Sequence, residues 1–329
     1  TRRSSDLKFA QLSGFVNGVL RNIARNIDSV QFDTLSIRYS MPQWIVDRFV
    51  AAYGEKKAEE IFKAFHSKST ISIRTNLTRC TPDELRVMLE AEGVTVTAVD
   101  ELNYAFVISG FDYLNGLQSF RDGLFYVQDI SSMLVAQTAA PKKGDYVIDV
   151  CAAPGGKSTH IAELLQGSGH VLARDLTDNK VDMIEENIER HGLNNMSAEV
   201  WDATVFDADS AGKADILICD LPCSGLGVLG RKKDIRYKMT PESVDELAAL
   251  QRQILDTVHT YVKPNGVLVY STCTIDEAEN EDNVRWFIEK HPEFELDKSF
   301  AEGTGMKQIL PGEHGSDGFF IARFIKSKL

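Results

Sequence analysis

The stretch YVIDVCAAPGGKSTH, residues 146–160, predicts how the rest of the chain folds. Residues 147–150 form a short apolar run that is typical of a buried parallel strand. The run ends at residues 152–156 (AAPGG), whose small side chains let the backbone come close to a ligand. A helix is expected to begin near Lys157, so that free backbone N–H groups point out of the turn. Strand, glycine turn and helix start together predict a nucleotide-binding crevice at the carboxyl end of a sheet.

The glycine pattern excludes two common nucleotide-binding motifs. A P-loop needs a glycine five places before Gly156, and Cys151 stands there. A dinucleotide fingerprint needs G-x-G-x-x-G, and only the adjacent pair Gly155-Gly156 is present. A different nucleotide cofactor is therefore expected, and a plain strand-to-helix turn that binds nothing is the alternative.

The composition is that of an ordinary globular protein. The 329 residues, 43% of them hydrophobic and 26% charged, leave room for about two domains. No apolar run is long enough to span a membrane. The five cysteines, at positions 80, 151, 219, 223 and 273, are scattered and odd in number, which favours reduced thiols and a cytoplasmic setting. Their spacing does not match a zinc site, so no metal is expected.

The net charge of −12 argues against a nonspecific polyanion binder. Residues 1–125 hold 15 basic and 15 acidic side chains, which leaves 21 against 33 for residues 126–329. The whole acidic excess therefore falls in the second part of the chain. Binding of RNA would depend on local basic patches, not on the overall field.

The part before residue 126 divides into two segments. Residues 1–36 contain an amphipathic helix, whose apolar stripe is Leu12, Phe15, Val16, Val19, Leu20 and Ile23. Residues 37–125 combine two helices with a strand, helix, strand, strand pattern, which predicts a small α+β domain of RNA-recognition-like topology. The aromatic strings of an RNA-recognition motif are missing, so a purely structural role for this domain is the alternative.

From residue 126 onward, strands and helices alternate, and polar residues follow the strands. Asp175 ends the second strand, about twenty residues past the glycines, where an acid meets ribose hydroxyls in nucleotide-binding sheets. Asp202 follows the third strand, and Asp220 the fourth. Cys223 and Cys273 stand just past two neighbouring strands, where open α/β sheets bind substrates. The acidic run at residues 275–281 is expected to begin a helix and to be structural.

These motifs together resemble the Sun/NOL/NSUN family of RNA cytosine-5 methyltransferases. The resemblance rests on the glycine stretch, on Asp220-x-Pro-Cys-Ser-Gly, on Ser-Thr-Cys273 and on residues 311–320 (PGEHGSDGFF). It covers nearly the whole chain from about Ile37, with minor departures at Leu221 and Arg174. Residues 15–20 (FVNGVL) also look like the last helix of a NusB-like domain, which makes residues 1–36 a remnant of that domain and its linker.

The resemblance implies an α/β fold with a Rossmann-like, S-adenosyl-L-methionine-dependent methyltransferase domain at residues 126–329. It implies that Cys273 attacks carbon 6 of a cytosine, that Cys223 assists proton removal or product release, and that Asp220 and Lys157 support them. The residues expected to contact the cofactor, from the resemblance and from the strand ends, are Cys151, Ala152, Ala153, Pro154, Gly155, Gly156, Lys157, Asp175, Lys180, Asp202 and Asp220.

The expected partner is ribosomal RNA, most directly 16S ribosomal RNA, bound by a monomer without a membrane. A flipped or single-stranded cytosine is favoured, since the base must leave its stack to react. The basic run at residues 230–238 follows the Pro-Cys motif and could hold phosphates through Arg231, Lys232, Lys233 and Arg236, although such runs are often only solvated surface. The alternatives are the same chemistry on transfer RNA or another RNA, and a non-catalytic ribosome-assembly factor.

Overall fold

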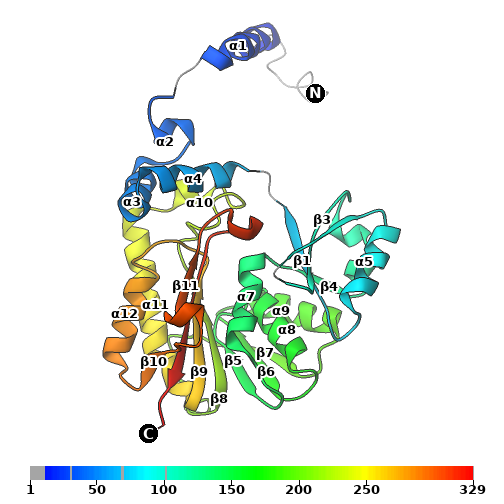
Figure 1. The fold of residues 1–329 in the computed structure, drawn as a ribbon, viewed down its shortest axis with the longest axis vertical. Coiled ribbons are helices and arrows are strands. Elements are labelled where there is room, and N and C mark those ends of the chain that lie inside the picture. The colour runs from blue at the N-terminus through cyan, green and yellow to red at the C-terminus, as the bar shows by residue number, and fades with distance from the viewer. Residues whose placement is uncertain (1–11, 30–31, 68–69, 101, 329) are drawn as a thin grey trace.

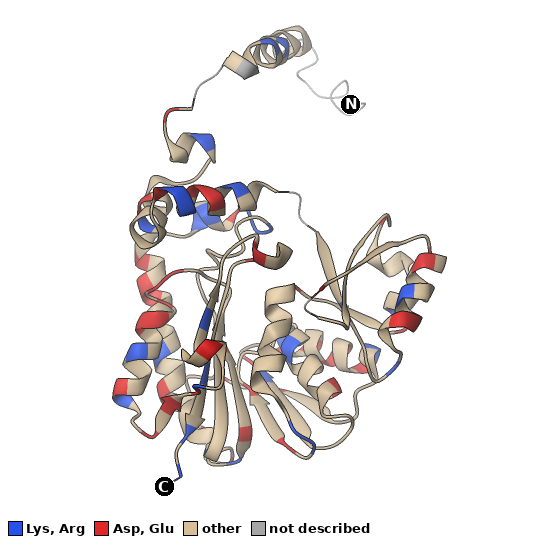
Figure 2. Ribbon diagram, in the orientation of Figure 1, with Lys and Arg blue, Asp and Glu red and all other residues tan. Residues whose placement is uncertain are grey.

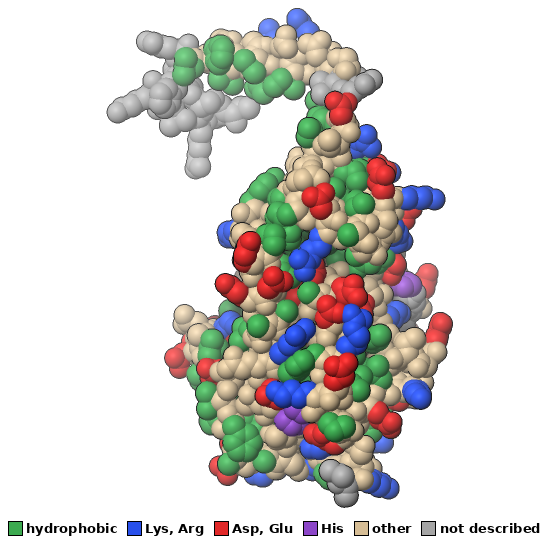
Figure 3. All heavy atoms as spheres, turned by 90° about the vertical axis from the view of Figure 1, so that its left-hand side faces the viewer, with side chains coloured by type: hydrophobic (Ala, Val, Ile, Leu, Met, Phe, Trp, Pro, Cys, Tyr) green, Lys and Arg blue, Asp and Glu red, His purple; other side chains and the backbone are tan. Residues whose placement is uncertain are grey.

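The computed structural model describes residues 12–29, 32–67, 70–100 and 102–328. Helix α1 (Ser13–Asn26) and a short 3-10 turn (Ile27–Ser29) stand away from the rest of the molecule (Figure 1). The short helix α2 (Leu35–Arg38) leads into the body of the molecule, where Leu35 packs against an apolar cluster. The apolar stripe predicted for helix α1 is exposed along one face, with Phe15 71% accessible (Figure 3). The first eleven residues of the predicted N-terminal segment lie outside the described residues.

Two helices, α3 (Gln43–Tyr53) and α4 (Glu55–His66), pack against each other and are joined at Gly54, whose φ of 78° suits a glycine. Their apolar faces, with Phe49 and Phe62 stacked at their centre, pack on residues far away in the sequence. These partners are Leu226, Leu229, Val244 and Ile275, which all come from the large domain. The helix pair therefore covers the top of the large domain (Figure 1).

The small domain is a four-stranded antiparallel sheet with the order β2-β3-β1-β4 and two helices. The capping box formed by Thr81 and Glu84 fixes the start of its longer helix. The βαββαβ sequence of elements confirms the predicted α+β domain and its RNA-recognition-like topology. The elements are β1 (Ile71–Thr75), α5 (Pro82–Ala91), β2 (Thr95–Ala98), β3 (Ala105–Ser109), a 3-10 turn (Leu114–Gly116), α6 (Gln118–Arg121) and β4 (Phe125–Val127).

The large domain is built on a mixed sheet with the order β10-β12-β9-β8-β5-β6-β7, and β11 pairs with β12. Strands β5 to β9 run parallel, and the last strands are antiparallel to them. The strands are β5 (Tyr146–Asp149), β6 (His170–Asp175), β7 (Met196–Val200), β8 (Ala214–Asp220), β9 (Val262–Thr272), β10 (Phe294–Leu296), β11 (Met306–Ile309) and β12 (Phe319–Lys326).

Helices cover both faces of this sheet, because successive strand residues point to opposite sides. Ile216 and Ile218 pack under α7, α8 and α9, whereas Leu217 and Cys219 pack under α11 and α12. This arrangement is the doubly covered α/β fold that the apolar strand runs predicted. The helices are α7 (Ile130–Ala139), α8 (Gly156–Leu164), α9 (Asp178–His191), α10 (Ile235–Lys238), α11 (Pro241–Val258) and α12 (Glu281–Lys290), with 3-10 turns at His259–Tyr261, Ala301–Gly303 and Glu313–Gly315.

A buried arginine links the two domains. Arg74 of β1 is 1% exposed and donates to Gln128 Oε1 at 3.0 Å, to Thr159 Oγ1 at 3.1 Å and to the Glu163 carboxylate. Thr159 and Glu163 belong to α8, the helix that follows the glycine turn. The small domain is therefore fixed directly against the helix that borders the predicted cofactor crevice.

Charge is distributed unevenly over this fold. Acidic side chains are frequent along α11 and α12 (Figure 2), and the outer face of these helices mixes both signs (Figure 3). Within the part of the chain that the structure describes, no helix combines the length and the apolarity that a bilayer crossing requires.

Candidate active site

The two cysteines predicted at strand ends meet in the structure. Strands β8 and β9 are parallel neighbours, and Asp220 pairs with Ser271 at their carboxyl ends. Cys223 lies three residues beyond β8, and Cys273 directly follows β9. Their sulfur atoms are 3.2 Å apart. Two thiols separated by fifty positions thus face one another beside the predicted crevice.

Glu279 holds the loop that carries Cys223. Its carboxylate accepts the Ser224 backbone N–H at 2.9 Å, the Ser224 hydroxyl, and the Gln251 side-chain amide at 2.9 Å. Glu279 is completely buried, and burial raises its pKa above the ordinary value. A buried carboxylate with three donors has little freedom to move, so it fixes the position of the Cys223 loop.

Asn280 holds the loop that carries Cys273. Its Oδ1 accepts the Thr272 hydroxyl at 2.6 Å, and its Nδ2 donates to the Thr274 carbonyl at 3.1 Å. The two loops also touch through Gly227, whose N–H donates to the Cys273 carbonyl at 3.1 Å. A Cβ at Gly227 would lie 2.3 Å from the Gly318 carbonyl oxygen, so only glycine allows this approach.

The sequence interpretation missed these supporting residues. It placed residues 275–281 at the start of an acidic helix, but α12 begins at Glu281, and the preceding residues form turns. Glu279 and its neighbour Asn280 lie in these turns, where they are buried and bonded to the cysteine loops. Their position in the sequence, six and seven residues after the candidate nucleophile Cys273, could have indicated that they support it.

The surroundings of the two thiols differ in charge. The hydrogen bond from Cys223 lowers the pKa of Cys273, and Lys157 and Lys232 add to this, against burial and Asp220. The same hydrogen bond, burial and Glu279 raise the pKa of Cys223. These opposite shifts favour the thiolate, which is the nucleophilic form, at Cys273 over Cys223.

Lys157 and Asp220 lie beside Cys273. Lys157 Nζ is 2.6 Å from Asp220 Oδ2, and Ser271 Oγ donates to Asp220 Oδ1 at 2.8 Å. The side chains of Lys157 and Asp220 are 14% and 26% exposed, so the pair remains open to a ligand from one side. The first turn of α8 is thereby joined to the end of β8.

The predicted cofactor loop has the conformation that a nucleotide site needs. Gly155 has a φ of 100° and precedes α8 without a side-chain cap. Asp149, the last residue of β5, lies just before the loop and accepts the Ser158 hydroxyl. The sequence interpretation did not single out this residue. Burial raises the pKa of Asp149 to about 7. The loop itself consists of Cys151, Ala152, Ala153, Pro154 and Gly155, with Gly156 as the first helical residue.

The acidic residues predicted at strand ends line up along the same edge of the sheet. Asp175 Oδ2 accepts the Ala153 N–H at 2.9 Å, and Asp175 Oδ1 lies 2.8 Å from Lys180 Nζ. Asp202 accepts the backbone N–H and the hydroxyl of Thr204 with one oxygen, at 2.8 and 2.7 Å. Carboxylates at this edge, next to uncapped helix N–H groups, fit the hydroxyl and amino donors of a nucleoside.

Comparison with known proteins identifies the family. Residues 136–325 match the family of 16S rRNA methyltransferase RsmB/F, and residues 41–111 match the ferredoxin-like domain of RsmF/B-like methyltransferases. A probable ribosomal RNA small subunit methyltransferase B from Bacillus subtilis (strain 168) is 38% identical over 96% of this chain and 74% of its own. The chain belongs to the RsmB/F methyltransferase family.

Solved structures agree with this family assignment. The protein PH0851 has a TM-score of 0.83 at 31% identity, over 89% of this chain and 67% of its own. NSun6 from Pyrococcus horikoshii, solved with the S-adenosylmethionine analogue SFG, has a TM-score of 0.78 at 25% identity, over 88% and 99%. These matches confirm the predicted fold of an S-adenosylmethionine-dependent methyltransferase and the cofactor that goes with it.

In the basic run predicted to contact RNA, the arginine side chains are bonded within the protein and the lysine side chains are exposed. Arg231 Nη2 lies 2.9 Å from Asp129, its Nε lies 2.6 Å from Asp317, and Nη1 donates to the Thr70 carbonyl at 2.9 Å. Arg236 is buried and donates to backbone carbonyls. Lys232 and Lys233 are exposed. The two arginines are therefore placed to connect protein segments, whereas the two lysines face solvent.

Proposed function

We propose that this chain methylates carbon 5 of a cytosine in 16S ribosomal RNA through a covalent adduct with Cys273, and that it acts as a monomer in the cytoplasm. The observation that carries the proposal is the convergence of the two sulfurs, 3.2 Å apart, at the strand ends beside the cofactor loop. The 16S substrate is supported by the family and by the relatives named for the small subunit.

Two thiols suit this reaction because carbon 5 of cytosine is a poor nucleophile. Addition of the Cys273 thiolate to carbon 6 converts the ring to an enamine, whose carbon 5 is nucleophilic. S-Adenosylmethionine, when bound, supplies the electrophilic methyl group. Transfer of that methyl group would form a bond to carbon 5 and leave S-adenosylhomocysteine. Loss of the carbon-5 proton to a water molecule would then restore the double bond and expel Cys273 as a thiolate.

The residues around the sulfurs have complementary tasks in this proposal. Lys157 favours the thiolate of Cys273, and Asp220 offers an acceptor for the amino edge of the cytosine. Cys223 lies next to the adduct sulfur, where it can assist proton removal or release of the methylated product.

The exposed lysines next to this site are proposed to contact the RNA backbone. Lys232 is close enough to Cys273 to influence its pKa, and Lys233 adjoins it. Charge reversal at both lysines should weaken RNA binding and leave cofactor affinity unchanged, since phosphate contacts position the substrate. Arg231 is not included, because its charge is already paired within the protein.

Transfer of a tritiated methyl group from the cofactor to RNA tests the function. The wild-type chain should label 16S ribosomal RNA at a cytosine, Cys273→Ala should abolish labelling, and Cys80→Ala, distant in the small-domain core, should retain it. If only transfer RNA is labelled, the substrate is transfer RNA and not 16S ribosomal RNA. If the wild type labels no RNA, the result supports an assembly factor without activity.

A further inference from the structure

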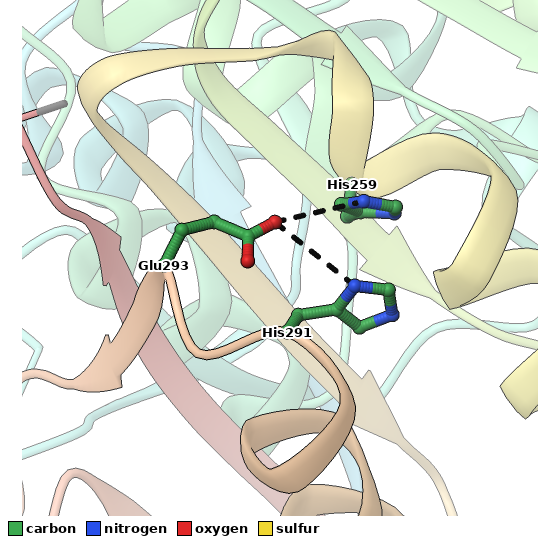
Figure 4. Close-up of side chains that lie close together, drawn as sticks. All are labelled: His259, His291 and Glu293. Carbon is green, nitrogen blue, oxygen red and sulfur yellow. Dashed lines mark ion pairs between the residues drawn. The ribbon is translucent and has the colours of Figure 1, made fainter.

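A second cluster of chemically reactive side chains lies far from the cysteines. His259, His291 and Glu293 present ligand atoms that all lie within 4.8 Å of one another (Figure 4). His259 Nε2 is 3.7 Å and His291 Nδ1 is 4.0 Å from Glu293 Oε1. We propose that this cluster binds a divalent transition-metal ion, zinc by ligand preference, as a structural site.

The types and spacing of the ligand atoms fit zinc. Two imidazole nitrogens and one carboxylate oxygen form a zinc ligand set that is known from catalytic sites, where a water molecule completes the tetrahedron. Ligand atoms about 2 Å from zinc lie about 3.3 Å apart in such a tetrahedron. The distances to Glu293 Oε1 are 3.7 and 4.0 Å, and all three ligand atoms lie within 4.8 Å of one another, so side-chain rotations would have to bring them closer to close the site.

The two imidazole rings lie next to one another. Their centroids are 3.9 Å apart, with an interplanar angle of 37°. A neutral imidazole has a free lone pair for a metal ion, so two adjacent rings can bind one ion together.

The other nitrogen of His291 lies near a carboxylate. His291 Nε2 is 3.2 Å from Asp256 Oδ1, but this buried nitrogen makes no hydrogen bond in the structure. Metal-binding histidines commonly donate their second N–H to a carboxylate, and a small rotation of the ring would align Nε2 with Asp256. Asp256 is thus placed to act as a positioning residue for this site, and it lies 2.9 Å from Lys290.

Glu293 is available to a cation. Its carboxylate contacts only the two imidazoles among the pairs that the structure describes. Lys326 lies within electrostatic reach of Glu293, but it donates to the Val262 carbonyl at 3.0 Å. The aromatic rings of Phe287 and Phe294 border His259 and shield the cluster from one side.

The position of the cluster indicates a structural role. His259 follows α11 and precedes β9, whereas His291 and Glu293 lie between α12 and β10. Cys273 is at the other end of β9, on the order of 30 Å away for an eleven-residue strand. A bound ion would connect α11, α12 and β10 without touching the reaction. This inference revises the expectation of no metal, which rested on cysteine spacing alone.

Zinc titration of the chelator-treated full chain tests the site. The titration uses a Cys223→Ser, Cys273→Ser background, so that active-site thiols do not compete. Calorimetry should show saturable uptake of one zinc per chain, together with a rise in melting temperature, because the ion binds only the folded form. Glu293→Gln should weaken binding at least about tenfold and Asp256→Asn about tenfold, while Glu295→Gln, an exposed neighbour, should change nothing.

Two results would overturn the metal site: no saturable uptake by the background chain, or equal affinity in the Glu293→Gln variant. Folding of each variant is checked by its urea midpoint without zinc. The test is independent of the proposed methylation, since neither binding nor melting depends on RNA or on the cofactor.

Discussion

Lys157 Nζ lies 2.6 Å from Asp220 Oδ2, which joins the helix after the glycine loop to the strand end before the Pro-Cys motif. The ion pair therefore couples the charges of the cofactor loop and of the cysteine loops. It also places a positive charge near Cys273, whose pKa Lys157 lowers. Residues that act as a unit are expected to give non-additive effects when they are changed.

A double-mutant cycle on this pair tests that expectation. Lys157→Met and Asp220→Asn should each lower kcat for methyl transfer by about 10²- to 10³-fold, the range for removal of one preorganised electrostatic group. The double variant should lose little more than the worse single variant, because each change already breaks the pair. Fully additive losses would show that the two side chains act separately.

Lys232 is predicted to tune the attacking thiol. Lys232→Ala should raise the pKa of Cys273, because a positive neighbour of the thiolate is lost. Alkylation of Cys273 by iodoacetamide, followed against pH without RNA, should shift to higher pH in this variant. Lys233→Ala, the adjacent exposed lysine, is the matched control and should leave the profile in place. A shift of equal size in both variants would point to a general charge effect.

Arg74 is predicted to be essential for stability because it holds two domains together from a buried position. Arg74→Met removes the partner of the buried Glu163 carboxylate, and such a change costs about 3–5 kcal/mol of unfolding free energy. Urea denaturation measures this loss. Adding Glu163→Gln to the variant should recover part of it, since the unpaired charge is gone. A loss under about 1 kcal/mol would contradict a buried, uncompensated Glu163.

Asp317 gives the fold a defined pH dependence. Burial and the Asp129 carboxylate raise the pKa of Asp317 to about 6, despite Arg231. The unfolded value is about 3.9, so the folded protein holds the extra proton between these limits. The neutral Asp317 carboxyl group therefore makes its full contribution to the free energy of unfolding below about pH 4. This contribution is lost as the pH rises through about 6.

Replacing Asp317 by asparagine should remove that loss. The melting temperature of Asp317→Asn minus that of the wild type should be higher at neutral pH than in acid, because asparagine never ionises. Glu295→Gln, which removes an exposed carboxylate, should show no such trend. A difference that is independent of pH would mean that Asp317 stays ionised in the folded protein throughout this range.

Local patterns predicted the parts of the molecule that depend on nearby residues. The strand, glycine turn and helix at residues 146–164 follow from apolar runs and backbone freedom, and the structure has them as β5 and α8. The placement of Cys223 and Cys273 followed from a general rule for open α/β sheets, in which parallel strands share one carboxyl edge.

Long-range partners could not be read from the sequence. Arg231 looked like a free phosphate ligand, but its partners Asp129 and Asp317 come from segments far apart along the chain. Glu279 was expected in the first turn of an acidic helix, but the structure bonds it to Ser224, fifty-five positions away. A polar side chain by itself does not reveal whether it faces water or a distant partner, and the fold decides this.

The adduct itself provides the most direct test of the account. Cys223→Ala, incubated with 16S ribosomal RNA and S-adenosylmethionine, should accumulate a covalent protein–RNA complex that survives denaturing electrophoresis, because release of Cys273 is impaired. The double variant with Cys273→Ala should show none. A stable complex in Cys273→Ala and none in Cys223→Ala would contradict the assignment of Cys273 as the attacking residue.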